Sequence, residues 1–159
     1  HERFLTSIHS WMAVPFNNNL GGTLDSNNWQ TYDRQIQGCL NAGAALCIVD
    51  IHNYARWNGA IVGQGGPTNA QFASLWSQIA AKYKGNNKIA FGLMNEPEAL
   101  LGKISKLSYN TNQVQHDLNI NTWATTVQAA VTAIRQAGAT GNKILLPGTD
   151  FTSAGAFIS

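Results

Sequence analysis

The sequence predicts an α/β fold in which buried parallel strands alternate with amphipathic helices. Three observations lead to this prediction. Short apolar runs follow stretches with apolar residues at helical spacing, and this happens three times in succession. The runs are continuous rather than alternating polar and apolar, which is typical of parallel strands covered on both faces. Each run also ends in polar residues of chemically reactive types.

The first unit is a helix followed by a strand. A helix is expected over residues 29–42, with Asn27 or Asn28 as its N-cap. Residues 45–51 then form a short apolar run that predicts a buried strand. The segment before this helix, residues 1–28, has no clear periodicity and is expected to be irregular. The apolar face of the helix consists of Trp29, Tyr32, Ile36 and Leu40.

The second unit repeats the pattern after a long connection. Residues 55–69 are rich in glycine and are expected to form a loop. A second helix is predicted over residues 70–84, and residues 88–95 predict a second buried strand. The tryptophans Trp29, Trp76 and Trp123 all lie on helical apolar faces, so we expect them to pack in the core.

The third unit contains an unusual insertion. A helix is predicted over residues 122–136 with Asn121 as its cap, and residues 143–148 predict the third strand. Residues 98–115 lack any clean periodicity and lengthen this unit relative to the one before it. We therefore expect residues 98–115 to be atypical for the fold.

Two α/β architectures fit this pattern: a doubly wound sheet and a (β/α)₈ barrel. The polar residues at the ends of the three runs favour the barrel, because the chemistry of barrels lies at the C-terminal ends of their strands. These residues are Asp50, His52 and Asn53 after the first run, Asn95 and Glu96 after the second, and Asp150, a weaker candidate, after the third.

Composition excludes several classes of protein. Only 11% of the 159 residues are charged and the net charge is +2, so neither disorder nor a nucleic-acid partner is expected. No apolar run is long enough for a membrane span. The four histidines lack ligand spacing, no nucleophile motif Gly-x-Ser-x-Gly is present, and the Gly63–Gly66 stretch does not follow a strand. We expect no metal and no cofactor, while Cys39 and Cys47 leave the redox compartment open.

Glu96 is the most informative carboxylate of the sequence. It follows an apolar run, and Pro97 after it favours an extended backbone. A carboxyl group at the mouth of a barrel would be partly desolvated, which raises its pKa and suits a general acid. Asn95 beside it has an amide that can hold a substrate hydroxyl. The alternative is that Glu96 is a loop carboxylate or a helix cap.

The end of the first run carries the candidate substrate-binding residues. His52 can orient a sugar hydroxyl or a neighbouring carboxylate, or it can be a hydrogen-bonded structural residue. Trp57 can offer a stacking face to a sugar ring, or it can pack the loop. Asn53 and Tyr54 lie between them, and Asp50 is expected to be structural, hydrogen-bonded beneath the site.

Three stretches of this sequence resemble fungal endo-β-1,4-glucanases of glycoside hydrolase family 5. They read IVDIHNYARWNG (48–59), GQGGPTNAQF (63–72) and FGLMNEP (91–97). The resemblance implies a (β/α)₈ barrel and a secreted enzyme that hydrolyses cellulose and related β-glucans with retention of configuration. We expect a β-glucan substrate as its partner, no membrane or nucleic acid, and a monomer when full length.

The resemblance also implies roles by position. Glu96 resembles the acid/base of the family on the fourth strand, Asn95 its substrate-binding neighbour, and His52 the active-site histidine after the third strand. Tyr54 and Trp57 would belong to the cleft, as would Asn53. A β-mannanase shares the Asn-Glu pair, and a non-catalytic carbohydrate-binding fragment is the other alternative.

The chain departs from the family in extent. The nucleophilic glutamate of the family would lie beyond Ser159, so we expect residues 1–159 to be an incomplete catalytic barrel domain, about strands 3 to 5, without activity by itself. Residues 5–16 and 98–115 do not fit the family. We hypothesise that 98–115 is translated intron, with a loop insertion as the alternative, and the sequence of the spliced transcript distinguishes the two.

Overall fold

A parallel sheet forms the centre of the computed structural model, which describes residues 4–8, 20–97 and 118–148. Within these residues the strands lie in the order β1-β2-β5-β6, and every neighbouring pair is parallel. The strands are β1 (Phe4–Ile8), β2 (Cys47–Ile51), β5 (Ile89–Gly92) and β6 (Lys143–Leu145). The helices that connect them are α2 (Ser26–Asn41), α3 (Asn69–Tyr83) and α5 (Ile120–Gln136). The predicted α/β class is confirmed.

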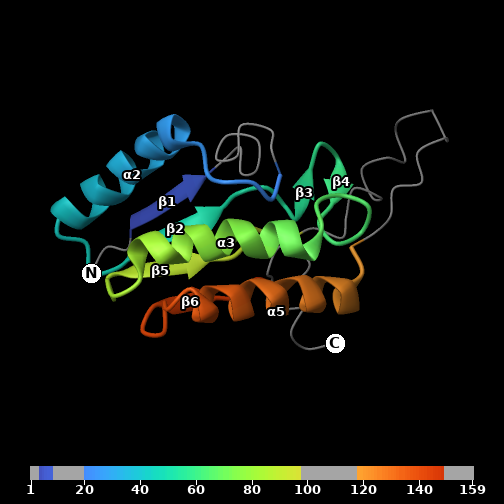
Figure 1. Cartoon of the computed structure of the whole chain (residues 1–159). Coiled ribbons are helices and arrows are strands. Elements are labelled where there is room, and N and C mark those ends of the chain that lie inside the picture. The colour runs from blue at the N-terminus through green and yellow to red at the C-terminus, as the bar shows by residue number, and fades with distance from the viewer. Residues whose placement is uncertain (1–3, 9–19, 98–117, 149–159) are drawn as a thin grey trace.

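The strand order distinguishes the two architectures that the sequence left open. Spatial order follows chain order without a reversal, whereas a doubly wound sheet changes direction at a switch point. Because crossovers between parallel strands are right-handed, a sheet that grows in one direction carries its helices on one face. Figure 1 shows α3 and α5 side by side along the same face of the sheet. This arrangement is that of consecutive units of a (β/α)₈ barrel.

The N-caps of two helices differ from the predicted ones. The cap of α2 is Asp25, whose carboxylate accepts a hydrogen bond of 2.8 Å from the Asn28 backbone N–H, so Asn27 and Asn28 were wrong as caps. The cap of α5 is Asn119 rather than Asn121. In both cases the cap has an extended backbone and a side-chain oxygen placed to accept from the first turn, and these conditions depend on geometry more than on residue type.

Strand β1 corrects the expectation that residues 1–28 are irregular. It pairs in parallel with β2 from Phe4 opposite Cys47 to Ile8 opposite Ile51. The atypical stretch 5–16 therefore begins inside a strand, and its remainder, 9–16, lies outside the described residues, as does 98–115. The short run FLTSI is not continuously apolar, so only its neighbour in the sheet identifies it as a strand.

A small hairpin corrects the expectation of an unstructured loop over residues 55–69. Strands β3 (Arg56–Trp57) and β4 (Ala60–Ile61) pair antiparallel across Asn58 and Gly59, whose φ angles are 48° and 78°. Asn-Gly with two positive φ angles favours the turn that matches the twist of a two-residue hairpin. The hairpin projects from the carboxyl end of β2 (Figure 1).

The core lies between the sheet and the helices. Trp29, Trp76 and Trp123 are 5%, 0% and 2% exposed, which confirms their prediction as core residues. A disulfide joins Cys39, near the end of α2, to Cys47 at the start of β2. Among the described residues, no helix combines the length and apolar character needed to cross a membrane.

Candidate active site at the carboxyl ends of β2 and β5

Backbone hydrogen bonds hold the segments after β2 and β5 side by side. The two strands pair up to Asp50 opposite Gly92. Beyond this point the Asn95 N–H donates to the Ile51 carbonyl over 2.6 Å, and the Tyr54 N–H donates to the Asn95 carbonyl over 3.2 Å. These bonds bring the predicted residues of both strand ends to one edge of the sheet.

A row of side chains connects the two strand ends. His52 Nδ1 lies 3.1 Å from Asp50 Oδ2, and His52 Nε2 lies 3.3 Å from Asn95 Nδ2. Asp50 is buried at 6% exposure, while the side chain of His52 is 25% exposed. The prediction that Asp50 is hydrogen-bonded beneath the site is confirmed, and His52 and Asn95 are in contact.

Tyr54 sits beside the histidine on an unusual backbone. Its φ is 53° and that of Ala55 is 61°, both in the left-handed region that non-glycine residues rarely occupy. The Tyr54 ring meets the His52 ring edge-on, with centroids 5.9 Å apart, and the tyrosine is 39% exposed. An Arg56 guanidinium N–H donates to the Tyr54 carbonyl over 3.1 Å. The loop thus presents an aromatic side chain to solvent next to the imidazole.

Asn53 and Trp57 occupy more structural positions than the other candidates. The Asn53 side-chain amide donates to the Arg56 carbonyl, which closes the turn leading into β3. Trp57 lies on β3, half-buried and packed against the hydrophobic core. Its remaining surface is available to solvent, so packing and substrate contact do not exclude each other at this residue.

Glu96 directly follows the row, with an exposed side chain and a φ of 39°. From the sequence we expected a desolvated carboxyl group at Glu96 and an extended backbone before Pro97, and both expectations are wrong in the described structure. The left-handed backbone turns the chain sharply between the half-buried Asn95 and the buried Pro97. The turn leaves the carboxylate in solvent at the same sheet edge as His52.

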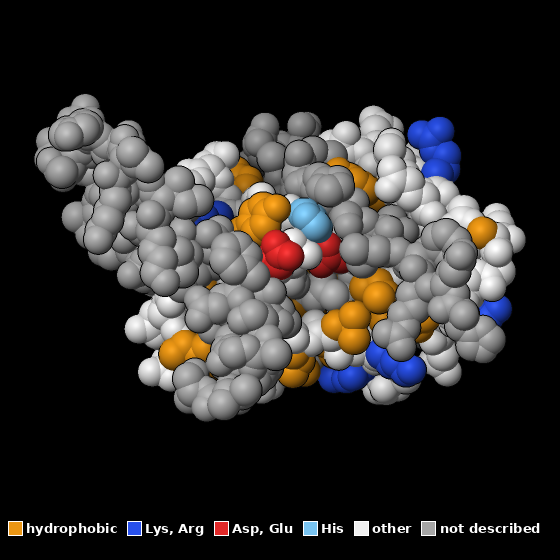
Figure 2. All heavy atoms as spheres, turned by 180° about the vertical axis from the view of Figure 1, so that it is seen from behind, with side chains coloured by type: hydrophobic (Ala, Val, Ile, Leu, Met, Phe, Trp, Pro, Cys, Tyr) orange, Lys and Arg blue, Asp and Glu red, His pale blue; other side chains and the backbone are white. Residues whose placement is uncertain are grey.

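The space-filling view places this chemistry on the side away from α3 and α5. Figure 2 shows a histidine with acidic side chains next to it on that side, and the only histidine that the structure describes is His52. Within residues 20–97 and 118–148, no group of three or more His, Cys, Asp or Glu side chains is arranged to hold a metal ion. Asp150, the weaker candidate, lies outside the described residues.

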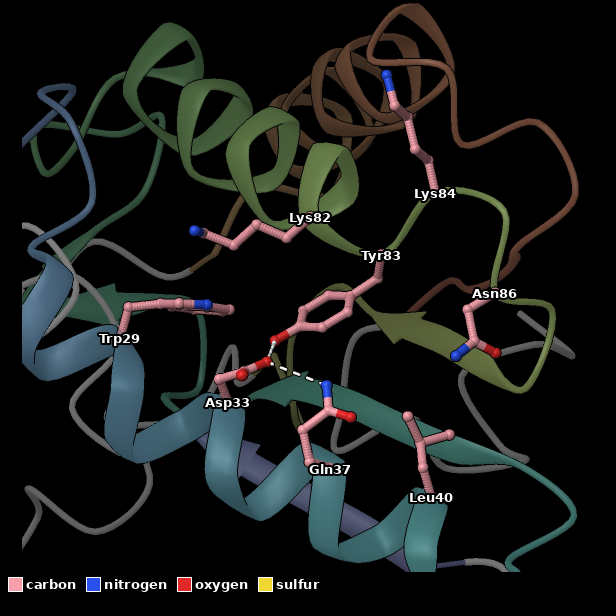
Figure 3. Close-up of a pocket in the computed structure, with 8 residues that line it drawn as sticks. All are labelled: Trp29, Asp33, Gln37, Leu40, Lys82, Tyr83, Lys84 and Asn86. Atoms are coloured by element: carbon pink, nitrogen blue, oxygen red, sulfur yellow. Dashed lines mark hydrogen bonds between the residues drawn. The ribbon is translucent and has the colours of Figure 1, made fainter.

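Away from these strand ends, a hollow of about 320 Å³ lies between α2 and the end of α3. Figure 3 shows Asp33 reaching the Tyr83 hydroxyl, which donates to Asp33 Oδ1 over 2.6 Å, while Lys82 lies over the Trp29 ring at 5.6 Å. Burial and the Asp33 carboxylate raise the pKa of the Tyr83 phenol well above its usual range. These side chains bond to one another, so we assign the hollow to helix packing. Its lining residues are Trp29, Asp33, Gln37, Leu40, Lys82, Tyr83, Lys84 and Asn86.

The sequence did not predict the contacts that hold the segment after β4 against α5. Gln64 accepts a hydrogen bond of 2.7 Å from the Asn119 N–H and so ties the segment after β4 to the start of α5. Gly63 lies so close to α5 that a Cβ there would come within 2.6 Å of Thr126 Oγ1. The glycine-rich stretch was a visible signal, but its partners are more than fifty residues away in the sequence.

A known protein family matches this chain. A model described as "Cellulase (glycosyl hydrolase family 5)" matches residues 4–158, which is nearly the whole chain. Endoglucanase EG-II of Hypocrea jecorina is 61% identical over 143 residues, which are 90% of this chain and 30% of that protein. The chain therefore spans about a third of the length of this curated relative.

Solved structures agree with the family match. The crystal structure of Cel5A (EG2) from Hypocrea jecorina (Trichoderma reesei) superposes with a TM-score of 0.81 at 55% identity and covers 98% of this chain and 41% of its own. The structure of XacCel5A in complex with cellopentaose gives a TM-score of 0.74 at 29% identity, over 96% of this chain and 41% of its own. In each comparison nearly all of this chain has a counterpart.

Proposed function

The chain belongs to glycosyl hydrolase family 5, and we propose that in a full-length enzyme it forms the acid/base half of an endo-β-1,4-glucanase active site. Glu96 is the general acid that protonates the leaving oxygen and then the general base that activates water. Asn95 holds the sugar next to the scissile bond, and His52, which contacts the Asn95 side chain, supports it.

The observation that carries this proposal is the meeting of Asn95, Glu96 and His52 at one edge of the sheet. A backbone bond of 2.6 Å and a side-chain contact of 3.3 Å join the segments that contribute them. Left-handed backbone at non-glycine residues costs free energy, and such residues cluster at functional sites. Here Tyr54, Ala55 and Glu96 all have this conformation next to the row of polar side chains.

We propose a retaining mechanism with a second carboxylate supplied from outside residues 1–159. Retaining glycosidases need two carboxyl groups about 5–5.5 Å apart, one of them the nucleophile. Glu96 is exposed on the sheet edge, so a carboxylate from another part of a full-length barrel can approach it. Packing of that part against this edge would also withdraw Glu96 from bulk solvent, as a catalytic cleft requires.

The substrate we propose is a β-1,4-glucan. The relatives are named endoglucanases, and XacCel5A has been solved with cellopentaose bound. In this chain, the exposed ring of Tyr54 and the half-exposed indole of Trp57 offer apolar faces on which the C–H side of a pyranose can stack. The Asn95 amide offers polar groups for the sugar hydroxyls. The side-chain oxygen of Asn53, whose NH₂ group donates to the Arg56 carbonyl, offers another.

We further propose that the enzyme is secreted. Disulfides persist in oxidising compartments such as the secretory pathway and the extracellular space. The Cys39–Cys47 bond supports this location, and a polymeric glucan is a substrate that must be met outside the cell.

The test is Glu96→Gln in the full-length coding sequence. We expect hydrolysis of carboxymethylcellulose to fall by about 10²–10⁴-fold, because an amide cannot protonate the leaving oxygen. An aryl cellobioside with a very good leaving group should lose much less in the glycosylation step. Asp33→Asn, which also removes one negative charge but lies between α2 and α3, serves as the control and should keep full activity.

Two results would contradict the proposal. Equal losses for poor and good leaving groups would mean that Glu96 does not act as an acid. Turnover of β-mannan at a rate above that of β-glucan would place the enzyme among the mannanases, which share the Asn-Glu pair.

A further inference from the structure

Asp50 is a buried carboxylate that the proposed mechanism does not use. It lies at the end of β2 with 6% of its surface exposed, and Gly92 pairs with it on β5. A Cβ on Gly92 would lie 3.4 Å from Asp50 Oδ1, so β5 packs closely beside the carboxyl group. Burying a carboxylate costs free energy unless hydrogen-bond donors contact it. The donors that contact Asp50 are therefore part of what keeps it buried.

The donors and acceptors among Asp50, His52 and Asn95 are consistent with one placement of the proton on the His52 ring. A carboxylate only accepts, so the His52 Nδ1 atom 3.1 Å from Asp50 Oδ2 carries the proton. In a neutral imidazole the other nitrogen, Nε2, is then an acceptor. The Asn95 Nδ2 atom at 3.3 Å is an N–H donor and matches it. Each polar contact from the buried carboxylate to the amide is thereby satisfied.

We propose that Asp50 is a positioning residue that sets the orientation of the Asn95 amide through the tautomer of His52. This inference rests on the proposed function, because it assigns Asn95 to the substrate. With one N–H committed to the His52 ring, the second N–H and the carbonyl oxygen of the Asn95 side chain keep fixed directions. The Asn95 amide therefore meets a sugar hydroxyl in one orientation rather than two.

Replacing the Asp50 carboxylate by an amide removes the preference of His52 for one tautomer. An asparagine at position 50 can donate to Nδ1 as well as accept from it, so both tautomers of His52 become accessible. In the tautomer protonated at Nε2, a donor would face the Asn95 N–H group, and the amide would turn over to present its oxygen to the ring. The group offered to the sugar would then be the wrong one in part of the molecules.

This reversal should reduce the rate rather than only the affinity. Hydrogen bonds to the 2-hydroxyl of the reacting sugar strengthen in the transition state of glycosidases. A misdirected amide leaves such a bond unmade, and in metalloenzymes residues that orient a functional side chain typically contribute 10–100-fold. We expect Asp50→Asn in the full-length enzyme to lower kcat/KM by about 10–100-fold, mostly through kcat.

A double-mutant cycle separates positioning from simple destabilisation. If Asp50 acts through Asn95, the variant Asp50→Asn/Asn95→Ala should be no slower than Asn95→Ala alone, because the amide to be oriented is gone. Multiplicative losses would overturn the inference. Asp33→Asn is the matched control, since it makes the same substitution at a hydrogen-bonded aspartate remote from the site and should leave kcat unchanged.

Nitrogen-15 spectra of the imidazole test the tautomer directly and need no variant. We expect the His52 signals of the wild-type enzyme to show a proton on Nδ1 and a bare Nε2 at neutral pH. A proton on Nε2 would overturn the inference even if Asp50→Asn fails to fold. If Glu96→Gln retains activity, the proposed function fails; if Glu96→Gln is inactive and Asp50→Asn is not impaired, only the role of Asp50 fails.

Discussion

The bond between Cys39 and Cys47 should contribute measurably to the stability of the full-length enzyme. It links the last turn of α2 to the first residue of β2, across the connection that reverses the chain. Both cysteines are buried, at 8% and 0% exposure. The perturbation is the reduction of this bond, either by a reductant or by the variant Cys39→Ala/Cys47→Ala.

The expected magnitude follows from the size of the closed loop. In the chain-entropy description, a cross-link lowers the entropy of the unfolded chain by about 2.1 + 1.5R ln n cal/mol/K, where n is the number of residues in the loop. With a sequence separation of 8, this gives about 2.5 kcal/mol at room temperature. The folded-to-unfolded ratio should fall by roughly 60-fold, since 1.4 kcal/mol corresponds to a factor of ten.

The assay is denaturant unfolding of the oxidised enzyme, the reduced enzyme and the alanine variant. The reduced wild type isolates the cross-link, because it keeps both sulfur atoms in the core, and the variant adds the effect of their removal. A difference below about 0.5 kcal/mol between oxidised and reduced wild type would refute the reasoning. So would a thiol titration that finds two free cysteines in the purified enzyme.

Three further predictions concern other parts of the molecule. Trp57→Ala should raise KM for glucan with kcat little changed, because a stacking face acts in ground and transition states alike; lost thermal stability at unchanged KM would make Trp57 a packing residue only. Tyr83 has a pKa raised by burial and by Asp33 above its ordinary value of 10.0, so its contribution to stability is present below pH 10 and lost at higher pH. Unfolding curves over this range should show a smaller loss for Tyr83→Phe. Expressed by itself, the 159-residue chain should fold poorly or self-associate and show no cellulase activity, because β1 and β6 end the described sheet at open edges; turnover that depends on Glu96 would contradict this.

Local sequence patterns were sufficient for most of the fold. Helix α3 was predicted within one residue at each end, because Phe72, Trp76 and Ile79 repeat at helical spacing and become fully buried. Strand β1 escaped prediction, since its residues need the pairing with β2 to be recognised as a strand. The hairpin also escaped, although Asn58-Gly59 is a strong turn signal, because the abundance of glycine around it favoured a loop.

The sequence predicted that the candidate residues lie close together, but not their backbone conformation. The positions of His52 and Asn95 after apolar runs brought them together correctly, because parallel strands end at the same edge of a sheet. The solvent exposure of Glu96 could not be predicted, since it depends on what packs against the edge rather than on the residues around it. The left-handed φ at Glu96 could not be predicted either, because the following proline favours an extended backbone at the residue before it.

The cluster of left-handed residues has a consequence for the evolvability of this enzyme. Tyr54, Ala55 and Glu96 each hold a conformation that costs an L-amino acid about 1–2 kcal/mol, whereas Asn58 holds it in a turn that favours asparagine, and all four lie beyond the carboxyl ends of β2 and β5. Selection for heat resistance could therefore gain backbone free energy with glycine at Ala55, but the change also removes a fully buried methyl group from the core, which offsets the gain. At Tyr54 and Glu96 the same change would delete a side chain to which we assign a role in the proposed function. A lineage adapting to higher temperature can thus release little of this stored energy while those proposed roles are under selection.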